Sequence, residues 1–75
     1  PQHQKAFRQL LDRYLAVVYN FIYQMTQDAQ QSEDLSQEVF LKVYQSLDKF
    51  DAKRPFKPWL LRITANITRS AFRKK

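Results

Sequence analysis

The chain has 75 residues, and 13 Lys and Arg residues against seven Asp and Glu residues give it a formal net charge of +6 at pH 7. This length allows one domain, because so short a chain buries only about 60% of the surface that its unfolded form exposes. With no cysteine and only His3 as histidine, disulfides, thiolate zinc sites and cysteine nucleophiles are excluded. We therefore predict no enzyme activity, no metal, no cofactor and no role for His3.

The composition also favours an all-helical protein with a polarised charge. The chain has no glycine, which two-residue β-hairpin turns commonly need. Residues 1–38 carry a net charge of −2 and residues 39–75 one of +8.

No apolar stretch approaches the ~20 residues that span a membrane, and no signal peptide is recognisable. We expect a soluble cytoplasmic protein without a membrane partner. Residues 1–75 should form one domain and be a fragment of a longer protein, because the chain begins with Pro and ends in a basic run.

The first predicted helix covers residues 4–25. Its apolar residues recur with the spacing i, i+3, i+4 and i+7 over about five turns: they are Phe7, Leu10, Leu11, Tyr14, Val17, Val18, Phe21 and Met25. The helix should end near Thr26, because Asp28 is a favourable N-cap for a second helix and Gln31 follows it with the spacing of a capping box.

Two further helices complete the predicted fold. The second covers residues 29–48 and turns Leu35, Val39, Phe40, Val43 and Leu47 inward. Residues 49–57 form a loop, since Pro55 and Pro58 each disfavour a helical residue before them. The third helix covers residues 58–73, with Pro58 in its first position and an apolar face made by Trp59, Leu60, Ile63, Ile67 and Ala71. We predict a small all-α bundle of three helices.

The second helix also has a polar face that contains one leucine. Opposite the apolar stripe lie Asp34, Gln37, Glu38, Leu41 and Gln45. One interpretation is a solvated face with a single exposed leucine, as many proteins have. Another is a docking surface, because an apolar centre within a polar rim is typical of protein interfaces. Acid–base chemistry by Asp34 and Glu38 is the weakest interpretation, since no pocket or electrophile accompanies them.

The third helix and the loop before it have the composition of a nucleic-acid surface. Away from the apolar face, the helix carries Arg62, Asn66, Arg69 and Arg73. Arginine binds phosphate through two parallel hydrogen bonds, and asparagine can bond the edge of a base. The alternative is a solubilising arginine face. The loop adds Lys49, Lys53, Arg54 and Lys57 beside Phe50 and Phe56, and such a mixture suits a single strand, which needs stacking and phosphate neutralisation. We expect at least one phenylalanine to fill the core instead, and Trp59 to be a core anchor rather than a stacking platform.

Two motifs resemble a known family. Residues 32–44 read SEDLSQEVFLKVY, residues 59–66 read WLLRITAN, and Arg73-Lys74-Lys75 follow. This combination is similar to region 2 of the sigma-70 family, and more narrowly to the extracytoplasmic-function (ECF) sigma factors of bacteria. There an E-D-L-x-Q-E-x-F helix precedes an aromatic and basic loop and a W-L-x-R-I-x-x-N helix. Phe7, Leu10 and Tyr14 match the family's opening F-x-x-L-x-x-x-Y.

The resemblance implies a role in transcription initiation and a partner for each surface. The helix over 29–48 would dock on the clamp helices of the largest subunit of core RNA polymerase, through Asp34, Gln37, Glu38 and Leu41. The loop and the third helix would recognise and melt the promoter −10 element, capturing a base flipped out of the non-template strand. DNA contacts would then come from Phe50, Lys53, Arg54, Phe56, Arg62 and Asn66, and by helical geometry from Arg69 and Arg73. An anti-sigma factor is a further candidate partner, because sigma domains of this kind are commonly held by one.

The chain departs from the family where Lys57 and Pro58 stand in place of a Ser or Thr, and it does not include the family's −35-binding domain. Three other functions stay open. A peripheral membrane module that uses the basic third helix is disfavoured, because the core needs the apolar face of that helix. A duplex-binding helix-turn-helix regulator is disfavoured, because the predicted connection of about nine residues exceeds the usual three or four. A domain that binds only proteins is the other alternative.

Overall fold

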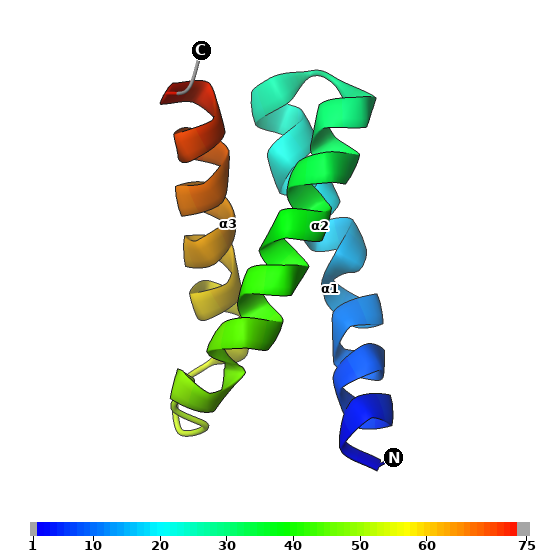
Figure 1. Cartoon of the computed structure of the whole chain (residues 1–75), viewed down its shortest axis with the longest axis vertical. Helices are drawn as coiled ribbons and strands as arrows, with labels where there is room; N and C mark the ends of the chain where they lie inside the picture. Colours follow the sequence, from blue (N-terminus) through cyan, green and yellow to red (C-terminus); the bar gives the residue numbers. More distant parts are fainter. Residues whose placement is uncertain (1, 74–75) are drawn as a thin grey trace.

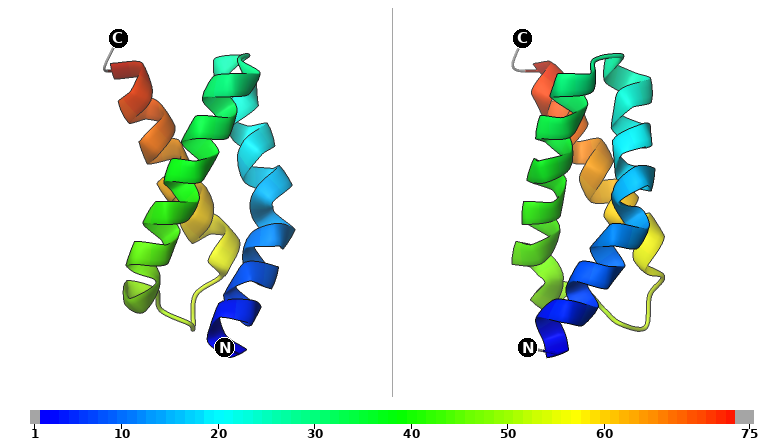
Figure 2. Two further views of the ribbon diagram at one scale, coloured as in Figure 1. Left: turned by 45° about the vertical axis from the view of Figure 1, so that its right-hand side comes forward. Right: turned by 90° about the vertical axis from the view of Figure 1, so that its right-hand side faces the viewer.

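The computed structural model describes the backbone of residues 2–73 and consists of three α-helices, as predicted. They are α1 (Gln2–Thr26), α2 (Ala29–Ser46) and α3 (Phe56–Arg73), and the 3₁₀ turn η1 (Leu47–Lys49) follows α2. Helices α1 and α2 form an antiparallel hairpin, and α3 crosses the hairpin obliquely (Figures 1 and 2). The molecule measures 38 × 19 × 17 Å. None of the described helices has the length and apolar character needed to cross a membrane.

The start of α3 differs from the prediction. The helix begins at Phe56 rather than at residue 58, so Lys57 is helical although a proline follows it, and the segment without helical structure shrinks to residues 50–55. Pro58 is the third residue of the helix, where its missing N–H still costs nothing because the first four N–H groups have no partner within a helix. The Phe56 ring contacts Tyr14 and Trp59, with centroids 5.2 and 5.6 Å apart, and the Tyr14 contact joins the first turn of α3 to α1.

The connection between α1 and α2 is stabilised by side-chain caps. Asp28 is the N-cap of α2, and its Oδ1 accepts a hydrogen bond from the N–H of Gln31 at 3.0 Å. The predicted capping box is only half formed, because the N–H of Asp28 donates to Thr26 Oγ1. Gln27 has a φ of 55°, a left-handed conformation that usually falls to glycine. Its Nε2 donates to the carbonyl oxygens of Tyr23 and Gln24 and so caps the end of α1.

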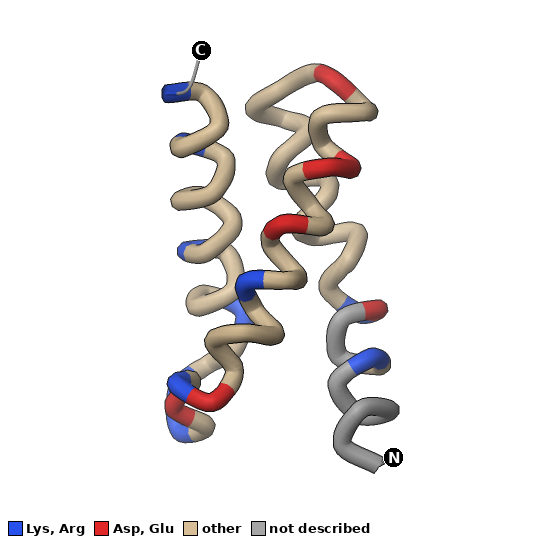
Figure 3. The backbone as a smooth tube through the Cα atoms, in the orientation of Figure 1, with Lys and Arg blue, Asp and Glu red and all other residues tan. Residues whose placement is uncertain are grey.

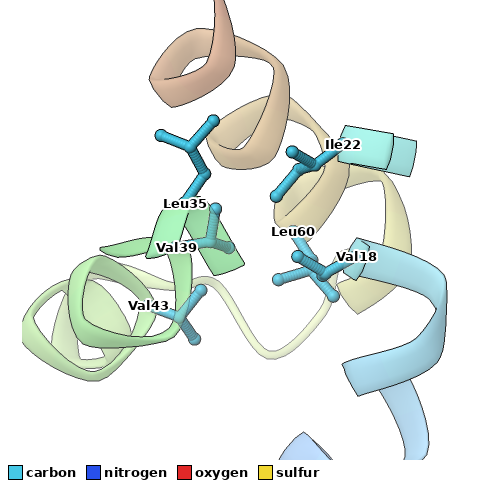
Figure 4. Close-up of a cluster of buried hydrophobic side chains, with 6 residues drawn as sticks. All are labelled: Val18, Ile22, Leu35, Val39, Val43 and Leu60. Carbon is cyan, nitrogen blue, oxygen red and sulfur yellow. The ribbon is translucent and has the colours of Figure 1, made fainter. Parts of the chain in front are cut away.

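The core lies between the three helices. Its fully or almost fully buried apolar residues are Val18, Ile22, Leu35, Val39, Val43 and Leu60 (Figure 4). The predicted stripe of α1 omitted Ile22 and wrongly included Met25, which is 41% exposed near the end of the hairpin. The side chains of Phe7, Leu10 and Leu11, which were also predicted in the stripe, lie outside the described part of the structure, as do Lys74 and Lys75 of the basic run.

Four buried hydroxyl residues were missed by the apolar pattern. Ser32 and Ser36 on α2, and Thr64 and Thr68 on α3, are buried within the bundle. Each hydroxyl donates to the carbonyl oxygen four residues earlier in its own helix, at 2.7 to 2.9 Å. Because these bonds satisfy the buried donors, small polar residues can replace apolar ones in the core.

Candidate nucleic-acid and protein interfaces

The loop between η1 and α3 is organised by Asp51. Its Oδ1 accepts a hydrogen bond from the N–H of Lys53 at 3.0 Å, and its carbonyl oxygen accepts one from the N–H of Arg54 at 2.9 Å. The Arg54 guanidinium lies 4.0 Å from Asp51 Oδ2, at the surface. These bonds close a turn in which the side chain of an aspartate bonds the backbone two residues on. The loop therefore has a defined shape although it contains no glycine.

Three aromatic rings join this loop to α3. The ring centroids of Phe50 and Trp59 are 4.7 Å apart, and Phe56 lies 5.6 Å from each of them. Phe56 packs against the core and reaches Tyr14 of α1, so it is the phenylalanine that fills the core, as expected. Trp59 also packs against the core, which confirms its prediction as an anchor. Phe50 is half-buried.

A cleft of about 470 Å³ opens between the loop and the first turns of α3. We call it the loop cleft; its lining residues are Lys49, Phe50, Asp51, Arg54, Pro55, Pro58, Trp59 and Arg62. The cleft combines aromatic walls with three cationic side chains and one carboxylate. It brings together three residues that the sequence predicted at a DNA site, Phe50, Arg54 and Arg62, and adds Trp59. Lys53 is exposed and does not line the cleft. Phe56 does not line it either, because its partly buried ring packs against the core.

The polar stripe of α3 is solvent-exposed along its whole length. Arg62, Asn66, Arg69 and Arg73 are all exposed, as the helical spacing predicted. Toward the end of the helix, Asn66, Arg69 and Arg73 line a hollow of about 200 Å³ together with Ser70. The loop and α3 carry basic residues, whereas most of the acidic residues lie on α2 and its N-cap (Figure 3). One face of the molecule is therefore suited to an anionic ligand.

The predicted docking residues form an exposed ridge along α2. We use the name α2 ridge for Asp34, Gln37, Glu38 and Leu41, all of which are exposed. Leu41 exposes 59% of its surface. The Asp34 carboxylate accepts a hydrogen bond from Gln30 Nε2 at 3.2 Å, which orients it on the helix surface. The ridge thus carries two carboxylates and ends in an exposed leucine.

Beside the ridge lies a groove that the sequence pattern did not reveal. It has a volume of about 860 Å³ between α1 and α2, and its lining residues are Leu15, Ala16, Tyr19, Asn20, Glu33, Ser36, Gln37 and Phe40. Leu15 is 50% exposed. The sequence did contain one sign of this groove. Leu15 and Tyr19 are two large apolar residues with i, i+4 spacing that fall outside the inward stripe of α1.

The chain is similar to a known protein family and to several known proteins. The model of the family described as Sigma-70 region 2 matches residues 10–75. The chain is 39% identical over 72 residues to the ECF RNA polymerase sigma factor SigW of Bacillus subtilis, which covers 96% of this chain and 38% of that protein. It is 36% identical to SigX of the same organism over 96% of this chain and 37% of the relative.

A third relative, the RNA polymerase sigma factor CarQ of Myxococcus xanthus, is 37% identical over 93% of this chain and 40% of its own length. The chain thus spans about two fifths of the length of these relatives. The match of the family model over nearly all of the sequence shows that the chain belongs to the Sigma-70 region 2 family.

Proposed function

We propose that the chain is the part of a bacterial ECF-type sigma factor that docks on core RNA polymerase and recognises and melts the promoter −10 element during transcription initiation. It would act in the cytoplasm as a binding protein and not as an enzyme. The observation that carries the proposal is the loop cleft, in which Phe50 and Trp59 stand beside the cationic side chains of Arg54 and Arg62. Its volume of about 470 Å³ lies within the ~300–1,000 Å³ of small-ligand sites.

In this proposal, the loop cleft receives a base flipped out of the non-template strand. The base stacks on the ring of Phe50, and Arg54 and Arg62 at the rim bind the adjacent phosphates. Taking a base out of the duplex costs a few kcal/mol. Phosphate contacts along Arg69 and Arg73 supply binding energy that offsets this cost, and an A·T-rich element lowers it further.

Docking on the polymerase would use the α2 ridge. The carboxylates of Asp34 and Glu38 suit basic side chains on a partner helix, and Leu41 supplies an apolar contact at the end of the ridge. The α2 ridge and the loop cleft are built from different elements, α2 against the loop and α3. The chain could therefore hold polymerase and DNA at the same time.

The test is a fluorescence-anisotropy titration of the chain with a labelled non-template single strand of a −10-type sequence. Its complement and the duplex are the controls, each at two salt concentrations. We expect selective binding of the non-template strand. The slope of log affinity against log salt should be about −0.7 for each phosphate contacted, and we expect roughly four to six such contacts. Equal affinity for the duplex would contradict the proposal.

A second candidate function, a domain that binds only proteins, is favoured by the groove between α1 and α2, whose walls include Leu15, Tyr19 and Phe40. An anti-sigma factor is the partner class to try. Binding of such a partner together with salt-abolished, sequence-blind DNA binding would support this candidate over the first. A helix-turn-helix regulator is less well supported, because residues 50–55 together with η1 make a connection longer than a three- or four-residue turn.

A further inference from the structure

The loop cleft contains a carboxylate that a phosphate-binding surface does not need. Its lining includes the ammonium group of Lys49 and the guanidinium groups of Arg54 and Arg62, and among them lies the side chain of Asp51. A carboxylate repels the phosphates that these cations attract, because like charges close together raise the free energy of binding. Asp51 should therefore contribute something to the cleft that offsets this repulsion.

One contribution of Asp51 is the turn of the loop. Its Oδ1 accepts a hydrogen bond from the N–H of Lys53 at 3.0 Å. An asparagine or a serine closes a turn of this kind as well, and neither brings a negative charge. The turn explains one side-chain oxygen at position 51, and it gives no role to the second.

The second carboxylate oxygen, Oδ2, keeps the capacity to accept a hydrogen bond from a ligand. It lies 4.0 Å from Nε of Arg54, which is longer than a hydrogen bond. The Asp51 side chain is 55% exposed and lines the cleft, so a ligand in the cleft can reach it. Because an ionised carboxylate accepts hydrogen bonds and donates none, the group that meets Oδ2 must be a donor.

We propose that Asp51 makes the loop cleft selective for a base with an exocyclic amine, which cytosine, adenine and guanine carry and thymine lacks. The base stacks on Phe50, and its amine donates a hydrogen bond to Asp51 Oδ2. Thymine has a carbonyl oxygen where cytosine has the amine, and the carboxylate repels that oxygen. This selectivity rests on the proposed function, which supplies the captured base, and it adds which bases the cleft accepts.

The experiment compares two labelled single strands of equal length, an oligo-deoxycytidine and an oligo-deoxyuridine, at mildly alkaline pH, where cytosine is not protonated. Uracil is thymine without its methyl group, so the two strands differ in the polar edge of the base. All bases in a strand are identical, so the captured position need not be known. We expect the chain to bind the cytosine strand about three- to tenfold more tightly, near the low end for a specific base contact because Asp51 is partly exposed.

Asp51→Asn separates the two roles of the side chain. Its Oδ1 can accept the N–H of Lys53 as before, whereas its Nδ2 donates where Oδ2 accepted. The ratio of cytosine to uracil affinity should therefore fall by at least about threefold. Asp51→Ser keeps the turn but has no amide, and it should remove the preference. Asp48→Asn removes the same charge in η1, outside the cleft lining, and should leave the ratio unchanged.

Circular dichroism of each variant shows that the helices are intact. A wild-type chain without preference for the cytosine strand would overturn the selectivity. So would an unchanged ratio in Asp51→Asn, or an equal change in Asp48→Asn. If the wild-type chain still prefers the non-template strand of the −10-type sequence over its complement and the duplex, the selectivity alone fails. If that preference is absent as well, the proposed function fails together with it.

Discussion

The phenyl ring of Phe50 lies against the indole of Trp59, with 4.7 Å between their centroids and 43° between their planes. Phe50 follows η1, and Trp59 is in the first turn of α3, so the contact closes the loop onto the helix. The aromatic wall of the loop cleft is consequently formed before any ligand arrives. A wall that needs no rearrangement saves the ordering cost of binding.

Phe50→Ala should weaken binding of the non-template single strand by about 1–3 kcal/mol, because one base loses its stacking partner. The measurement is the anisotropy titration, with circular dichroism to show that the variant is folded. Tyr23→Ala is the matched control, since Tyr23 is an aromatic residue 39% exposed on α1, and it should leave the affinity unchanged. An unaltered affinity in Phe50→Ala would argue against base capture in the loop cleft.

Arg69→Gln should reduce the salt dependence of single-strand binding by about 0.7 in the slope of log affinity against log salt, as expected for the loss of one phosphate contact. The measurement is affinity at several salt concentrations. Arg13→Gln removes the same charge from an exposed position of α1 and should leave the slope as it is. Equal slopes in both variants would mean that Arg69 holds no phosphate.

Asp34→Lys should weaken binding to core RNA polymerase at least tenfold, because like charges placed opposite each other at an interface cost several kcal/mol. Binding of the single strand should stay nearly constant. Asp48→Lys makes the same change in η1, outside the α2 ridge, and serves as the control in a pull-down or surface-binding assay. A similar loss of polymerase affinity in both variants would mean that long-range attraction between the chain and the polymerase, and not contact at the α2 ridge, is responsible.

Leu60→Ala should lower the free energy of unfolding by about 2–5 kcal/mol, since it leaves a cavity at a fully buried position between the three helices. Leu41→Ala makes the same truncation at a side chain that is 59% exposed and should change stability by no more than about 0.5 kcal/mol. Chemical denaturation followed by circular dichroism measures both. Similar losses would show that Leu60 is not part of the core.

Asp28→Ala should destabilise the chain by about 0.5–2 kcal/mol, because the N–H of Gln31 loses its capping acceptor. Asp28→Asn keeps an oxygen in the same place and should recover most of this stability. Thermal unfolding of the two variants provides the comparison. Failure of the asparagine to restore stability would show that the carboxylate does more than cap α2.

The helices and the general position of the surfaces were predictable, because both depend on local spacing. The 3.6-residue period placed Leu35, Val39 and Val43 on the buried face of α2 and left Asp34 and Glu38 outside, and the structure agrees. The same period placed Arg62 and Asn66 on one exposed face of α3. The N-cap at Asp28 was recognisable because a capping residue acts on its immediate neighbours.

Features that depend on contacts between distant residues were decided only in the folded chain. Helix α3 starts two residues earlier than predicted, at Phe56, whose ring packs on Tyr14, 42 positions before it. Thr64 and Thr68 enter the core because their hydroxyls bond their own helix, which hydropathy alone does not indicate. The crevice between Glu38 and Asn66 is lined by residues of both α2 and α3, so it exists only once these helices pack together. Sequence periodicity states which face of a helix a residue occupies, and tertiary packing determines which residue of another helix it meets.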